Sequence, residues 1–155
     1  MQIRKAENCD FSEIYKLISN ELGYPNLVEE DVLNRLDHFT GSDEWATFVA
    51  VVDNEIAGFI GIMKGMAYTV DGFYSQIMAL AVSEKVQRRG AGTALLKKAE
   101  EWSLSQGISD IVISCNLKRL AAHDFYEAMG YTKLSYKFCK SLNNKAPQNP
   151  AITVS

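Results

Sequence analysis

A glycine-rich stretch between two apolar segments carries the residue types that most directly suggest chemistry. Residues 86–96 read VQRRGAGTALL, and Gly90 and Gly92 stand where a strand-like run gives way to a helix-like run. The first N–H groups of a helix lack intrahelical partners and form an anion site at the positive end of the helix dipole, which glycine lets a phosphate approach closely. Such an arrangement suits a pyrophosphate. For the glycines taken alone, a tight turn with two solvated arginines is the favoured interpretation, because short glycine patterns are weakly specific.

Two better-known phosphate loops do not fit this stretch. A P-loop requires G-x-x-x-x-G-K-S/T, and no lysine follows at the required place. A dinucleotide fingerprint requires a third small residue where Leu95 stands. Both of these nucleotide-binding classes are therefore excluded.

Composition bounds the remaining function classes. The chain has 155 residues, 47% of them hydrophobic, and a net charge of −3, which suits one domain that buries about two thirds of its unfolded surface. No basic excess points to nucleic acid. Three cysteines without C-x-x-C spacing suggest neither a disulfide framework nor a metal site. The start has no apolar leader, and the longest apolar run, Ile77 to Val82, is too short for a bilayer, so we expect a cytoplasmic protein without a membrane partner.

The elements before the loop follow from hydrophobic periodicity. Residues 10–22 predict a helix that opens on an Asp10–Glu13 capping box, and a second helical stripe runs from Val28 to Phe39. Two β-rich runs around residues 53–55 predict a hairpin. Residues 73–82 predict a central strand that is apolar enough toward its end to be buried on both faces.

The elements after the loop alternate between helix and strand. A helical stripe ends at Gly107, residues 110–116 predict a buried strand, residues 118–130 a helix and residues 136–142 a last strand. The polar remainder, residues 143–155, predicts a flexible tail. The sequence thus predicts one α/β domain with a mostly antiparallel front half and a strand-helix-strand-helix-strand back half.

The loop and its surroundings resemble the acyl-CoA site of the GNAT family of N-acetyltransferases. Residues 87–92, QRRGAG, match the family pattern Gln/Arg-x-x-Gly-x-Gly/Ala at every specified position, and FYEAMGY follows at the expected distance. The resemblance spans nearly all of residues 2–142. It implies the GNAT acyl-CoA N-acyltransferase fold over residues 1–142, a central mixed, mostly antiparallel sheet flanked by helices, with splayed fourth and fifth strands. Within the family, the stretch from Ser114 onward is most similar to the aminoalkylphosphonate N-acetyltransferase branch.

The resemblance implies acetyl-CoA as co-substrate and a set of residues that bind it. Pantetheine is expected to lie between the splayed strands like a substitute strand, because an extended amide chain satisfies their exposed N–H and C=O groups. For Asn116, a pantetheine contact and a strand-end turn remain equal alternatives, and Arg119 contacts either phosphate or substrate. The implied cofactor-binding residues are Leu80, Ala81, Val82, Gln87, Arg88, Arg89, Gly90, Ala91, Gly92, Thr93, Asn116, Arg119, Phe125 and Tyr126.

Tyr126 is the residue to which the resemblance assigns catalysis. Aminolysis of a thioester must expel a thiolate, and a nearby hydroxyl can stabilise or protonate that sulfur. A tyrosine with a pKa near ~10 stays protonated at neutral pH, about 1.5 units above a thiol near ~8.5. The alternative is a core tyrosine, since Ala122, Tyr126 and Met129 share a helical stripe. His123 and His38 are expected at the surface rather than in catalysis.

One departure from the family pattern concerns the general base. Many members place a carboxylate on the fourth strand where this chain has Ala79. A base must then come from Asp71, Tyr68, an acidic residue of the first two helices or ordered water.

We therefore expect direct transfer of an acetyl group to a primary amine of a small molecule, such as an aminoalkylphosphonate. A non-catalytic acyl-CoA-binding regulatory module, or acetylation of a protein or peptide amine, remains an alternative. A homodimer is compatible with the sequence.

Overall fold

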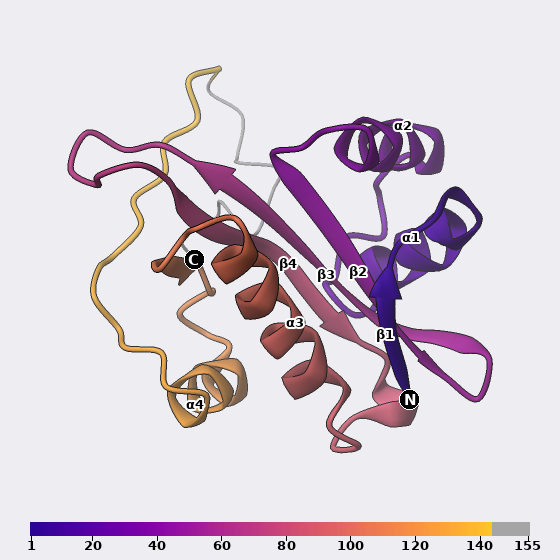
Figure 1. The fold of residues 1–155 in the computed structure, drawn as a ribbon. Coiled ribbons are helices and arrows are strands. Elements are labelled where there is room, and N and C mark those ends of the chain that lie inside the picture. Colours follow the sequence, from indigo (N-terminus) through magenta and orange to yellow (C-terminus); the bar gives the residue numbers. More distant parts are fainter. Residues whose placement is uncertain (144–155) are drawn as a thin grey trace. The chain divides into compact units, whose positions relative to one another are not determined.

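The computed structural model describes residues 1–143 (Figure 1). The chain divides into two compact units, Met1–Val112 and Ile113–Ser155, and each is described by itself below. One catalytic domain over residues 1–142 stays a prediction, and the predicted tail lies, except for Asn143, outside the described residues. No helix in the described part of the chain combines the length and the apolar character needed to cross a membrane.

The elements follow one another largely as the periodicity predicts. In chain order they are β1 (Gln2–Lys5), the short 3-10 helix η1 (Asn8–Asp10), α1 (Phe11–Asn20), α2 (Glu29–Thr40), β2 (Trp45–Val52), β3 (Glu55–Gly65), β4 (Tyr74–Val82), the 3-10 helix η2 (Glu84–Val86), α3 (Ala91–Ser105), β5 (Ile111–Ile113) and α4 (Leu120–Ala128).

The strands form one sheet in the order β1-β2-β3-β4-β5. β1 to β4 pair antiparallel with their neighbours, and β5 runs parallel to β4. This arrangement confirms the predicted mixed, mostly antiparallel sheet. The hairpin between β2 and β3 turns through Asp53 and Asn54 with φ angles of 53° and 65°, which is the type I′ geometry that matches the strand twist.

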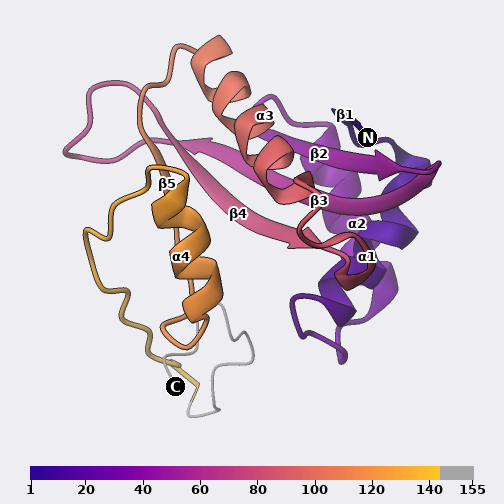
Figure 2. The same cartoon turned by 90° about the horizontal axis from the view of Figure 1, so that it is seen from below.

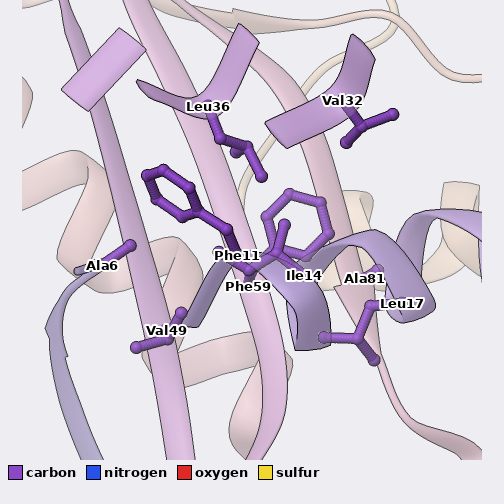
Figure 3. Close-up of a cluster of buried hydrophobic side chains, with 9 residues drawn as sticks. All are labelled: Ala6, Phe11, Ile14, Leu17, Val32, Leu36, Val49, Phe59 and Ala81. Atoms are coloured by element: carbon purple, nitrogen blue, oxygen red, sulfur yellow. The ribbon is translucent and has the colours of Figure 1, made fainter. Parts of the chain in front are cut away.

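Helices cover both faces of the sheet in the first unit (Figures 1 and 2). α3 packs on β2, β3 and β4, whereas α1 and α2 contact β3 and β2 from the opposite face. Under α1 and α2, apolar side chains at helical spacing meet those of the strands (Figure 3); the cluster consists of Ala6, Phe11, Ile14, Leu17, Val32, Leu36, Val49, Phe59 and Ala81. Each of the larger side chains contributes about 1.5–3 kcal/mol by burial.

A β-bulge in β4 changes the predicted burial of that strand. Ile77 lies opposite Ile62 and Ala79 opposite Gly61, so Met78 is an extra residue without its own partner in the register. Met78 is 47% exposed. The prediction that β4 is buried on both faces is therefore wrong at this residue, because a bulge interrupts the alternation of side chains.

The predicted capping box of α1 is also wrong. The carboxylate of Asp10 does not cap α1 but accepts hydrogen bonds from Arg4 at 2.6 and 2.8 Å and from the backbone N–H of Glu7 at 2.8 Å. The reciprocal box consists of Glu7 and Asp10 and belongs to η1. The Arg4 guanidinium holds the pKa of Asp10 below its usual range, because the hydrogen bonds favour the charged carboxylate.

Two strands after α3 differ from their predictions. β5 covers only three residues of the predicted range 110–116, and its Val112 is 44% exposed rather than buried. Residues 136–142 are irregular, so the predicted last strand is wrong. A strand forms only when a neighbouring strand satisfies its backbone N–H and C=O groups.

Candidate active site

The predicted anion loop lies between β4 and α3 in the first unit. Gly90 is the N-cap of the 15-residue α3 and provides no side-chain cap. The first helical hydrogen bond runs from Ala94 N to Gly90 O at 3.0 Å, so the N–H groups of Ala91, Gly92 and Thr93 precede the helical ladder. These three donors stand at the positive end of the helix dipole, which is the arrangement that binds anions.

The two glycines of the loop have different structural justifications. Gly90 has a φ of 82°, a left-handed conformation that glycine adopts without strain. Gly92 lies inside α3 and is absent from the residues with positive φ, although a helical glycine costs about 1 kcal/mol relative to alanine. The turn alternative accounts for Gly90, but Gly92 needs another reason, and close approach of a ligand to the main chain provides one.

The charged residues of the loop remain accessible. Arg88 and Arg89 are exposed, and Arg88 has the uncommon left-handed φ of 65°. Arg89 Nη1 lies 3.8 Å from Asp53 Oδ2 between two exposed side chains, which is worth less than about 1 kcal/mol. Gln87 Nε2 donates a long bond of 3.5 Å to Val82 O. Neither contact prevents the guanidinium groups from pairing with a phosphate.

The residues expected to bind pantetheine form the last part of β4. Leu80, Ala81 and Val82 pair with β3, and the bulge at Met78 comes shortly before them. The start of β4 is bonded to the residue before β5, because Ser75 N donates to Asp110 O at 2.8 Å. β5 ends at Ile113, after three residues, whereas β4 has nine residues and ends at Val82. Splaying of the two strands stays a prediction. Sequence reasoning missed the bulge, because residue types carry no signal for one extra residue in a strand.

Ala79, which stands where many family members have a carboxylate, lies on the side of the sheet that α1 and α2 cover. Ala79 is partly buried and packs against the apolar cluster under these helices. Of the alternative bases, Tyr68 and Asp71 are exposed in the β3–β4 connection. Among the described acidic residues near α1, Glu13 pairs with Lys16 at 2.6 Å, and Glu21 Oε1 accepts a bond from Glu84 N at 3.3 Å.

In the second unit, Tyr126 lies on α4 with its hydroxyl in a poorly solvated environment. Burial raises the pKa of Tyr126 to about 12, the nearby thiol of Cys115 adds to this effect, and the Arg119 guanidinium opposes it. The ring lies edge-on to Phe125, with centroids 5.3 Å apart, and 5.9 Å from the ring of Tyr131. Tyr126 is therefore a protonated donor throughout the physiological pH range.

Cys115 lies near Tyr126 and contributes to the raised pKa of that hydroxyl. Burial raises the pKa of Cys115, whereas the charge of Arg119 lowers it. The thiol is thus protonated at neutral pH, which disfavours a role as nucleophile. A single cysteine without a motif gives no sequence signal for its place beside Tyr126.

Asn116 forms the turn between β5 and α4. Its Oδ1 accepts the Lys118 N–H at 2.9 Å and its main-chain O accepts the Arg119 N–H at 3.0 Å. The same main-chain O lies 2.9 Å from Nε2 of the partly buried His123. The turn alternative therefore explains the side-chain oxygen of Asn116, whereas the amide nitrogen is the group that can donate to a ligand.

The two histidines differ from each other. His123, expected at the surface, is partly buried and holds the carbonyl of Asn116. His38 is exposed at the end of α2, where its ring meets Phe39 edge-on at 6.1 Å.

Comparison with known proteins identifies the family. The sequence profile of the acetyltransferase (GNAT) family matches residues 10–131. The chain is 28% identical over 148 residues to the aminoalkylphosphonate N-acetyltransferase of Salmonella typhimurium, covering 91% of each chain. It is 26% identical to the crystal structure of a GNAT family acetyltransferase from Staphylococcus aureus, with a TM-score of 0.73 and coverage of 91% of this chain and 98% of that one.

A third likeness concerns the fold alone. The aminoglycoside N-acetyltransferase AAC(6')-Iy, solved in complex with CoA, has a TM-score of 0.81 at 15% identity and covers 90% of this chain and 93% of its own. Acetyl-CoA is the co-substrate that goes with this family and fold. The match to the family profile spans most of the chain, so this protein belongs to the GNAT family and is an N-acetyltransferase.

Proposed function

We propose that the protein transfers the acetyl group of acetyl-CoA to a primary amine of a small molecule by direct attack. The observation that carries the proposal is the start of α3, where three N–H groups precede the helical ladder and Gly92 is not required by the backbone. The pyrophosphate binds these N–H groups, with Arg88 and Arg89 beside it. Pantetheine binds the main chain of Leu80, Ala81 and Val82, and the amide nitrogen of Asn116 donates to one of its carbonyl groups.

The reaction balances without a covalent enzyme intermediate. The ammonium loses one proton to water or a carboxylate, and its lone pair attacks the thioester carbonyl. The nitrogen of the tetrahedral adduct then loses its second proton to water and the C–S bond breaks, which releases the neutral amide and the CoA thiolate. The Tyr126 hydroxyl donates a hydrogen bond to that sulfur, and the thiolate regains a proton as the free thiol.

The raised pKa of Tyr126 refines this role. A hydroxyl with a pKa of about 12 is a poorer proton donor to a thiol near ~8.5 than an ordinary tyrosine. The gap between the two pKa values is roughly 3.5, so complete proton transfer is uphill. We infer that Tyr126 acts by hydrogen bonding to the developing thiolate, and that water finally protonates the sulfur.

An aminoalkylphosphonate is the acceptor that we propose first. The relative named for this activity matches over 91% of both chains. With Ala79 in place of a carboxylate, an amine of pKa near ~10 is free in only about one molecule in a thousand at pH 7, which costs roughly 4 kcal/mol without a base. We therefore propose ordered water as the proton acceptor, or a flanking carboxylate such as Glu21.

A thiol-release assay with acetyl-CoA tests the proposal. Aminoalkylphosphonates are compared with polyamines, amino acids, aminoglycosides and protein N-termini at equal concentration, and release with an aminoalkylphosphonate is expected to be fastest. Acetyl-CoA at about a hundred times its dissociation constant should also stabilise the fold by roughly 2.7 kcal/mol, with NAD and ATP doing much less. Stabilisation by acetyl-CoA without turnover of any amine would favour a non-catalytic binding module. Equal stabilisation by all three ligands would contradict the cradle.

A further inference from the structure

We infer that His123 is a positioning residue that sets the place of the Tyr126 hydroxyl by tying α4 to the turn at Asn116. This inference rests on the proposed function, because it matters for catalysis only if Tyr126 and Asn116 both contact the same thioester. All the contacts that carry it lie within the second unit.

The need for such a tie follows from how weakly α4 is held otherwise. The helix has nine residues, and none of them is fully buried within the described residues. A helix shorter than about 12–15 residues is marginal in water, and packing of an apolar face usually stabilises it. α4 also lacks a side-chain cap, since its N-cap is Arg119 and an arginine side chain has no acceptor for the first N–H groups.

The imidazole of His123 supplies the missing connection. Nε2 lies 2.9 Å from Asn116 O across seven positions of the chain, in a partly buried place. A carbonyl oxygen only accepts, so Nε2 carries the proton and donates. The same carbonyl accepts the Arg119 N–H at 3.0 Å. The imidazole of His123 and the N–H of Arg119 together hold the loop at Asn116 against the first helical turn of α4.

The tie acts on Tyr126 through the helix. His123 and Tyr126 are three residues apart and therefore neighbours on one helix face. Rotation or displacement of the first turn carries the Tyr126 hydroxyl away from the sulfur, and a misplacement of about 1 Å can cost a hundredfold in rate.

Two substitutions of His123 test the inference in the full-length protein. His123→Leu removes the donor at similar volume, and we expect kcat to fall about ten- to a hundredfold, with little change in the KM for acetyl-CoA. His123→Gln keeps an N–H donor at comparable reach and should restore most of kcat. His38→Leu, on the exposed histidine of α2, is the matched control and should leave kcat unchanged.

A double-mutant cycle with Tyr126→Phe separates positioning from a merely structural role. If His123 acts through the hydroxyl, His123→Leu should lower kcat less than about twofold once the hydroxyl is absent. Equal losses in both backgrounds, or full activity of His123→Leu, would overturn the inference. Normal turnover of Tyr126→Phe would instead remove Tyr126 from the proposed mechanism.

Imidazole nitrogen shifts measured by NMR on the wild-type protein provide a test that does not depend on any variant folding. At a pH where the ring is neutral, His123 should be protonated at Nε2. The opposite tautomer would contradict the bond to Asn116 O, and with it the inference.

Discussion

α3 and α4, the helices that follow β4 and β5, are held in place by different interactions. α3 starts at a left-handed Gly90 with no side-chain cap, and its buried residues Ala91, Leu95, Leu96, Ala99 and Ser103 hold it against the sheet. α4 buries no residue fully within the described part of the chain, and the Asn116 carbonyl and the His123 imidazole secure its start.

On the proposed function, this difference separates binding from catalysis. Burial along α3 fixes the helix without using its first N–H groups, so that these remain available to an anion. α4 carries the proposed catalytic hydroxyl, and hydrogen bonds to its own turn secure it. Changes at the start of α3 should therefore alter affinity, whereas changes on α4 should alter turnover.

The largest expected effect is that of Tyr126→Phe on turnover. Phenylalanine keeps the ring packing against Phe125 and removes the hydroxyl. We expect kcat to fall by about 10²- to 10³-fold, the usual effect of losing one positioned hydrogen-bond donor, while acetyl-CoA affinity and stability barely change. Steady-state kinetics at saturating acetyl-CoA and amine measure this. The absence of a pre-steady-state burst of product in the wild type establishes that product release does not limit its rate.

The pH profile of the wild-type enzyme sharpens the same comparison. Because the pKa of Tyr126 is raised to about 12, no loss of kcat from tyrosine ionisation is expected up to about pH 10. A decline with a pKa near 9 that disappears in Tyr126→Phe would contradict the assigned environment of the hydroxyl.

The next effect is on stability and concerns the ion pair that ties β1 to η1. Asp10→Asn leaves the Arg4 guanidinium without its charged partner Asp10, and we expect the free energy of unfolding to fall by about 2 kcal/mol. The loss stays below the 3–5 kcal/mol of fully buried pairs because Arg4 keeps contact with solvent. Chemical denaturation at pH 7 measures it, and kcat of the folded variant should remain near wild type. A kcat loss comparable to that of Tyr126→Phe would contradict the expectation that this ion pair affects stability and not turnover.

The pH dependence of this pair has a defined sign. The pKa of Asp10 is lowered in the folded state, so the pair contributes its full stability above the unfolded value near ~3.9 and loses it as pH falls through the folded pKa. Wild type and Asp10→Asn should therefore converge in stability below about pH 4. A difference that stays constant down to pH 2 would exclude linkage to this carboxyl.

The smallest expected effect on the fold comes from the two loop glycines. Gly92→Ala should raise stability by about 0.5–1 kcal/mol, because alanine is the better helix former where φ is not positive. Gly92→Val, by contrast, should weaken acetyl-CoA binding, since a branched side chain enters the place of closest approach, whereas the family pattern also accepts alanine there. Gly90→Ala should destabilise by about 1–2 kcal/mol through its left-handed φ. Thermal melts with titrated acetyl-CoA measure both. Unchanged acetyl-CoA affinity in Gly92→Val would favour the turn alternative.

Much of the fold and of the candidate site could be predicted because the signals are local. The periodicity of residues 10–22 and 28–39, the hairpin around Asp53 and the loop QRRGAG each occupy a short window of sequence, and hydrophobic spacing and turn chemistry act over that range. The family pattern extended these local signals to Tyr126 and Asn116.

The sequence by itself determined which residues are helical, which stretch begins a helix with glycine, and that a tyrosine stands on the helix after the fifth strand. Only the tertiary structure decided that Met78 forms a bulge, that Asp10 pairs with Arg4 instead of capping α1, and that residues 136–142 form no strand. It also decided that His123 binds Asn116 O. The reason is physical: spacing sets which side chains share a face, but a hydrogen bond or a strand pairing depends on which partner the folded chain brings within reach.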